Sequence, residues 1–253
     1  LIDGPHSKST IGTEESIKKI SKEDLENFHS EMYSPYNVKI IIAGNVNPKD
    51  MEVVRSLNLD EGTKTVKHVS QLKEGIVCDK FEESQQVHFL FSHKGLPLVN
   101  EDTLYPSMVL NTLLGSGMSS LLFEKIREKR GLVYDISTNN IQSKEWGVFS
   151  IYAATSKENT EKLSEELFNL FRNFKLTKKL FDYGKKRLLG SLELVTESTS
   201  ALTSLYIQYV ANELTIRSID DIIERVKSVT ESQVIDAFET MIKGQWSLAY
   251  VTP

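Results

Sequence analysis

The chain has 253 residues, of which 40% are hydrophobic and 26% are charged, and its formal net charge is -5. The length allows one large domain or two smaller ones. The mildly acidic balance argues against a nucleic-acid-binding protein, because neutralising phosphates needs clustered lysine and arginine. No apolar run approaches the roughly 20 residues of a membrane helix, so we expect no membrane partner. The start, Leu1-Ile2-Asp3, lacks methionine and the layout of a signal peptide, and we expect an interior segment of a longer protein.

The first part of the chain contains two clear helix signals and one strand signal. Ser21, with Asp24 three residues later, predicts a helix with a capping box. The β-branched run at 38–44 predicts a buried strand, and Pro48 is typical of the first turn of a short helix. Because a single strand cannot form a sheet alone, we predict that residues 1–58 are the C-terminal remnant of a domain.

After a polar linker predicted at residues 59–73, a second domain is predicted at 74–253. Val87, Phe89 and Phe91 fall on one face of a strand by period two. The order of elements predicts an α+β fold, in which helices pack on a largely antiparallel β-sheet. The expected elements are strands at 75–80 and 85–93, a helix at 103–114, a helix capped by Ser119 or Ser120 and running to Arg127, strands at 132–138 and 147–154, five helical segments between 157 and 241, and a strand at 246–251.

Cysteine and histidine usage offers little sign of metal or redox chemistry. Cys78 is the only cysteine, which excludes an internal disulfide and fits a reducing compartment. Its apolar neighbours predict a buried, inert thiol. His88 and His93 are five apart on a predicted strand and point to opposite faces. His29 is predicted to be a surface residue.

One segment carries a family resemblance. Residues 115–134, GSGMSSLLFEKIREKRGLVY, are similar to the glycine-rich loop, the "SSRLF" helix start and the "REKRGLVY" signature of pitrilysin/insulinase-type zinc metallopeptidases, a family that includes the mitochondrial processing peptidase and its bacterial relatives. The segment departs from the family at Leu121, where many relatives have arginine. Residues 11–17, 33–37 and 43–46 resemble the end of the family's first domain, in the same order, so the similarity covers nearly the whole chain.

The resemblance implies a two-domain half-clamshell whose first domain binds zinc through a His-x-x-Glu-His motif and a distant glutamate. This chain lacks the motif, and no two of its histidines are three or four apart; they are His6, His29, His68, His88 and His93. We therefore expect zinc in the full-length parent and none in this chain, which alone should be inactive. The implied partners are a peptide substrate and the missing N-terminal zinc domain, and the resemblance also implies a homo- or heterodimer.

The resemblance also assigns roles to Arg127 and Tyr134, which hold the substrate backbone and support the oxyanion in the family. A guanidinium and a phenol are suited to this, because both donate hydrogen bonds to developing negative charge. Without the resemblance, Arg127 is interpreted as a solvated charge at the end of a helix, and Tyr134 as a residue that packs within a strand. The loop Gly115-Ser116-Gly117 is implied to touch the substrate, although a helix stop and turn also explains its glycines.

The sequence thus predicts the C-terminal half of a zinc-dependent endopeptidase that cleaves peptides in a clamshell chamber. The alternative is a non-catalytic partner or structural core subunit of the same family. The expected location is the cytoplasm, with the mitochondrial matrix as the alternative.

Overall fold

The computed structural model describes residues 2–4, 7–66, 71–98, 101–144, 146–244 and 246–253. The chain forms two compact units. Unit 1 takes in the described residues of 1–3, 71–194 and 217–253, and unit 2 takes in those of 4–70 and 195–216. The predicted domain boundaries remain a prediction, because compactness alone does not identify a domain. No helix in the described part of the chain is long and apolar enough to cross a membrane.

Unit 1 is built on a five-stranded sheet with the order β3-β7-β4-β6-β5. β3 runs parallel to β7, whereas the other three pairs of neighbours are antiparallel. The strands are β3 (Gly75–Lys80), β4 (Val87–Lys94), β5 (Val133–Gln142), β6 (Gly147–Thr155) and β7 (Trp246–Thr252). The predicted α+β fold with a largely antiparallel sheet is therefore confirmed. Unit 1 also contains the short pair β1 (Ile2–Asp3) and β2 (Gln71–Leu72).

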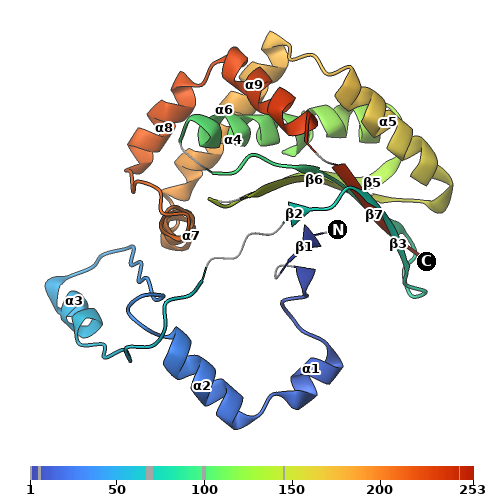
Figure 1. Cartoon of the computed structure of the whole chain (residues 1–253). Helices are drawn as coiled ribbons and strands as arrows, with labels where there is room; N and C mark the ends of the chain where they lie inside the picture. Colours follow the sequence, from blue (N-terminus) through green and yellow to red (C-terminus); the bar gives the residue numbers. More distant parts are fainter. Residues whose placement is uncertain (1, 5–6, 67–70, 99–100, 145, 245) are drawn as a thin grey trace. The chain divides into compact units, whose positions relative to one another are not determined.

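Helices cover one face of this sheet (Figure 1). They are α4 (Glu101–Gly115), the π-type segment η2 (Phe123–Glu128), the short 3₁₀ turn η3 (Lys157–Asn159), α5 (Thr160–Arg172), α6 (Lys178–Val195), α8 (Ile219–Ser228) and α9 (Glu231–Ile242). The predicted helical region from 157 to 241 is confirmed. α9 begins with a capping box, in which the side chains of Thr230 and Gln233 each accept a hydrogen bond from the other residue's backbone amide.

The core lies between the helices and the sheet. Val87, Phe89 and Phe91 are at most 1% exposed, whereas His88 and Leu90, between them, are exposed. This alternation follows from the two-residue period of a strand and confirms the predicted faces of β4.

His93 continues the buried face of β4 and is surrounded by aromatic rings. Its ring stands edge-on to Phe91 with centroids 5.0 Å apart and stacks on Phe171 at 5.9 Å. Neither ring nitrogen has a hydrogen-bond partner among the described residues. Burial in this apolar setting lowers the pKa of His93 to about 4, because the charged form cannot be solvated.

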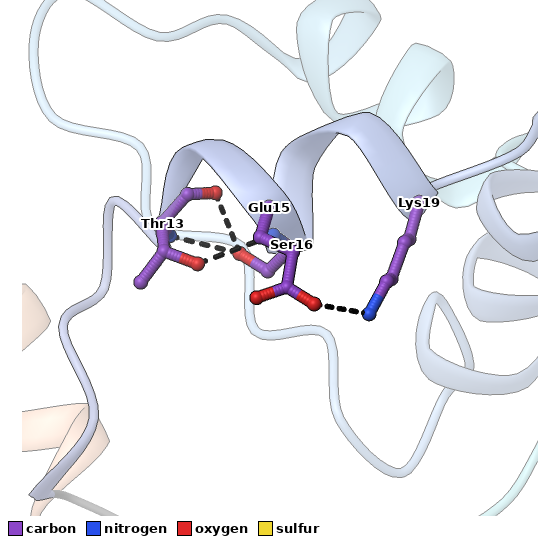
Figure 2. Close-up of polar contacts among 4 residues, drawn as sticks. All are labelled: Thr13, Glu15, Ser16 and Lys19. Carbon is purple, nitrogen blue, oxygen red and sulfur yellow. Dashed lines mark hydrogen bonds and ion pairs between the residues drawn. The ribbon is translucent and has the colours of Figure 1, made fainter.

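Unit 2 contains α1 (Glu14–Lys19), α2 (Lys22–Met32), α3 (Pro48–Arg55) and α7 (Thr199–Ala211). Each of the first three begins with a capping box. Figure 2 shows the box of α1, where Thr13 and Ser16 bond each other, together with an ion pair of 2.5 Å between Glu15 and Lys19. The capping box predicted for α2 is confirmed, since Ser21 Oγ accepts from the Asp24 amide at 3.1 Å.

The strand predicted at 38–44 is wrong. Residues 38–43 form no regular element, and Ile40 and Ile42 are 48% and 44% exposed. A β-branched run becomes a strand only where another strand completes its hydrogen bonds, and no described strand of unit 2 does so.

The segment predicted as a linker, residues 59–73, forms hydrogen bonds with other parts of the chain. The Asn37 side chain donates to the Thr63 carbonyl at 2.8 Å and accepts from the Thr65 amide at 3.0 Å. Residues 71–72 pair with β1, while residues 67–70 lie outside the described residues. The bonds of Thr63 and Thr65 therefore lie within unit 2, to which this part of the segment belongs.

The prediction of a buried Cys78 is also wrong, since the thiol is exposed. Its apolar neighbours Ile76 and Val77 are 60% and 48% exposed. They lie on β3, which is an edge strand of the five-stranded sheet.

Candidate functional site

Arg127 lies on the π-type segment η2 (Phe123–Glu128). Ile126, 1% exposed, fixes this helix on the core, while Arg127 is exposed on its outer side. The guanidinium lies over the Phe123 ring, 4.7 Å from its centroid. No carboxylate among the described residues forms an ion pair with Arg127, so its donors are available to a ligand. Single π-type turns are frequent at functional sites.

The start of this helix differs from the prediction. Neither Ser119 nor Ser120 caps it with a side chain; the Glu124 amide instead donates to the Ser120 carbonyl at 2.9 Å. Ser120 is 0% exposed, and its hydroxyl has no hydrogen-bond partner among the described residues. Because the side chain packs inward, it cannot turn back to the first helix amides.

Gly131 ends the helix. Its φ of 63° lies in the left-handed region that a residue without Cβ adopts easily. The Gly131 amide donates to the Arg127 carbonyl at 3.0 Å, and the Leu132 amide donates to the Ile126 carbonyl at 3.2 Å. The chain then enters β5 within two residues of the turn.

Tyr134 occupies a β-bulge at the beginning of β5. Val133 pairs with Thr155 and Asp135 with Ala154, so the register shifts by one at Tyr134. In a regular strand Tyr134 would alternate with the exposed Asp135 and face the core. The extra residue instead leaves Tyr134 59% exposed. Bulges re-aim side chains and are over-represented next to active sites.

The glycine loop is held by packing. The Tyr183 hydroxyl donates to the Ser116 carbonyl at 2.7 Å. A Cβ on Gly115 would collide with the Thr138 side chain of β5, and Gly117 has a φ of 88°. These contacts account for both glycines structurally, so a role for Gly115, Ser116 and Gly117 in substrate binding remains a prediction.

The five predicted site residues thus belong to one stretch of unit 1 that runs from the end of α4 into β5. η2 packs against β5, and Gly115 contacts the helix-facing side of the same strand. Thr138 is four positions along the strand from Tyr134, or about 13 Å. Sequence reasoning missed Tyr183, because its partner lies 67 residues away and no local pattern links the two.

The histidines of the described residues do not converge on a metal site. His29 stacks on Tyr33, the His88 Nδ1 lies 2.9 Å from the Tyr152 hydroxyl, and His93 is buried among aromatic rings. No group of three or more histidine, cysteine or acidic side chains in the described part of the chain could hold a metal ion. The described residues therefore do not fit a zinc site.

Comparisons with known proteins identify the family of the chain. Residues 19–188 match the sequence family described as "Peptidase M16 inactive domain". A Bacillus subtilis protein named "Uncharacterized zinc protease YmxG" is 28% identical over an alignment of 252 residues, with 96% of this chain and 60% of that protein covered.

Two solved structures show the same fold. A peptidase M16 inactive domain from Pseudomonas fluorescens has a TM-score of 0.84 at 24% identity, with 98% of this chain and 61% of that chain covered. A chain in complex III2 from Candida albicans has a TM-score of 0.81 at 15% identity, with 97% and 62% covered. This chain thus spans about 60% of the length of each of these proteins.

Proposed function

The chain belongs to the family of peptidase M16 inactive domains, and we propose that it is the C-terminal half of a zinc-dependent endopeptidase that cleaves peptides in a clamshell chamber. Its own contribution is to bind the substrate backbone and to support the oxyanion. The observation that carries the proposal is that Arg127 and Tyr134 are both exposed and each lies at a backbone irregularity, a π-type turn and a β-bulge.

Arg127 and Tyr134 provide the donors that this role needs. The scissile carbonyl oxygen gains negative charge as the peptide bond is attacked, and a guanidinium or phenol donor aimed at it stabilises the transition state. Arg127 has no ion-pair partner among the described residues, and Tyr134 is turned outward by the bulge. The loop Gly115-Ser116-Gly117, anchored by Tyr183, would border the bound peptide.

Zinc, when bound, supplies the activated water of such a peptidase. The relative from Bacillus subtilis is named a zinc protease and is longer than this chain. We therefore assign the metal to an N-terminal domain of the full-length parent, the principal partner of this half. A homo- or heterodimer and a cytoplasmic setting, with the mitochondrial matrix as the alternative, belong to the same proposal.

A second function is favoured by one observation. A chain of the same fold occurs in complex III2 from Candida albicans. The alternative is therefore a non-catalytic partner or structural core subunit, in which the same fold serves assembly.

The test is Tyr134→Phe in the zinc-loaded full-length parent, assayed by cleavage of a fluorogenic peptide library. Loss of one donor, worth about 2–4 kcal/mol, should lower kcat/KM roughly a hundredfold with the fold intact. Tyr36→Phe is the matched control, because Tyr36 is 60% exposed against 59% for Tyr134. Arg127→Lys should rescue Arg127→Ala poorly, because an ammonium does not reproduce the planar fork.

Two results would count against the proposal. Cleavage by Tyr134→Phe at the rate of Tyr36→Phe would remove Tyr134 from the site. A zinc-loaded parent that cleaves no peptide would favour the non-catalytic alternative.

A further inference from the structure

A pocket of about 940 Å³ opens in unit 1 beside η2, apart from the residues proposed to meet the substrate. Its walls are the side of η2 away from Arg127, the second half of α5, the turn at 173–177 and the first turns of α6. Neither Arg127 nor Tyr134 lines it. The volume lies in the range of pockets that bind small molecules.

The floor of the pocket is apolar and only partly covered. The side chains that form it are Leu121, Leu170, Phe174, Leu180 and Tyr183, and each is of intermediate exposure. Five partly exposed apolar groups in one concave surface form a patch that a ligand with an apolar body would cover.

The rim carries more positive than negative charge. Both acidic side chains of the pocket are paired, Glu124 with Lys129 at 2.6 Å and Glu166 with Arg130 at 3.2 Å. The three remaining rim cations, Lys125, Lys175 and Lys179, form no ion pair with any described residue. This excess stands out in a chain whose net charge is -5.

The electrostatics of Glu124 show that these cations share one region. The pKa of Glu124 is lowered first by its hydrogen bond to Lys129 and the charge of that lysine, and then by the charges of Lys125 and Lys179. Lysines from η2 and from α6 therefore act on a single carboxylate. A second anion placed at the rim would meet the same field.

We propose that this pocket binds a small amphipathic anion, with an apolar body against the leucines and Phe174 and an anionic head group at Lys175 and Lys179. The apolar floor supplies affinity by removing hydrocarbon from water. The lysines supply selectivity for a negative head group. Neither Arg127 nor Tyr134 belongs to this site, which adjoins the loop Gly115-Ser116-Gly117 through Tyr183 and does not depend on zinc.

Calorimetric titration of the 253-residue chain with decanoate, octanoate and hexanoate tests the floor. Each methylene removed should weaken binding by up to about fourfold, which corresponds to about 0.8 kcal/mol per buried methylene. Decyltrimethylammonium, with the same chain and the opposite charge, should bind at least tenfold more weakly than decanoate. Equal binding of the two decyl compounds would overturn the proposal.

Charge-neutralised variants test the rim. Lys175→Gln with Lys179→Gln should weaken decanoate binding at least tenfold, with the far-ultraviolet circular dichroism unchanged. The matched control neutralises Lys94 and Lys157, which are exposed lysines outside the pocket, and should bind as the unaltered chain does. Equal affinity of both double variants would overturn the site.

A peptide arm tests the class of ligand. A synthetic heptapeptide of alternating glutamate and leucine should bind more weakly than decanoate. Tighter binding of this peptide, lost in the Lys175→Gln, Lys179→Gln variant, would overturn the small-molecule assignment in favour of an acidic protein segment.

Discussion

A capping box begins α9 in unit 1 and α1, α2 and α3 in unit 2, yet these helices differ in what they bury. In unit 1, α9 starts at a Thr230 capping box and buries four side chains, among them Val234 and Phe238. In unit 2, α1, α2 and α3 each start at a capping box and bury none. A cap forms from bonds within four residues of chain, whereas burial requires a second layer to cover the apolar face. The comparison separates helix formation from core formation.

The difference between the units would be refuted if the stability of unit 2 depended on its apolar side chains as strongly as the stability of unit 1 does. Phe91→Ala should destabilise unit 1 by about 3–5 kcal/mol, because it leaves a cavity in a closed core. Phe28→Ala, at a side chain 59% exposed, should stay within about 0.5 kcal/mol. Urea unfolding followed by tryptophan fluorescence measures unit 1, since Trp146 and Trp246 both lie there, and urea unfolding followed by the backbone chemical shifts of α2 measures the effect of Phe28→Ala on unit 2. A similar loss in both variants would contradict the division.

The pH dependence of unit 1 sharpens the comparison further. The pKa of His93 falls from 6.5 to about 4 on folding, so between those values the unfolded chain binds the extra proton. Stability should therefore decrease as the pH is lowered from 6.5 to 4, by about 3 kcal/mol in all. His93→Phe should remove this component from the fluorescence-detected unfolding curves at pH 4.5, 5.5 and 7. An unchanged slope in that variant would refute the assignment.

Substitutions in the capping boxes should have the smallest effect on stability. Thr230→Ala should cost unit 1 about 1 kcal/mol, because α9 packs on the core and its cap bonds are lost. Ser21→Ala removes the same kind of bonds from α2 but should leave the fluorescence-detected stability of unit 1 unchanged. It should lower the helicity of α2, measured by backbone chemical shifts. If both substitutions shift the unfolding midpoint of unit 1 alike, the two units are not independent.

Local signals were predictable from the sequence, and signals that depend on a distant partner were not. The Ser21 cap is formed within four residues and was found correctly. The run at 38–44 has the composition of a strand but no strand beside it. Cys78 was predicted to be buried because its neighbours are apolar, but it lies on an edge strand that has a partner strand on one side only, and its thiol is exposed.

The candidate site divides in the same way. The motif between Gly115 and Tyr134 identified the stretch of chain that forms the candidate site. The π-type hydrogen bonding of η2 and the bulge at Tyr134 were not predicted, because each depends on packing of a helix or strand against the core. The catalytic roles of Arg127 and Tyr134 remain predictions that only the full-length parent can test.

The position of β7 between β3 and β4 has a consequence for biosynthesis. β4, β5 and β6 leave the ribosome one after another and can pair as soon as they are made. β3 leaves before all of them, yet Gly75 pairs with Ser247, which is made 172 residues later. During that interval β3 is a nascent strand with exposed Ile76 and Val77 and no neighbour, a state prone to pairing with other chains. The sheet of unit 1 is therefore completed late in translation, and β3 is the segment for which a chaperone would matter most.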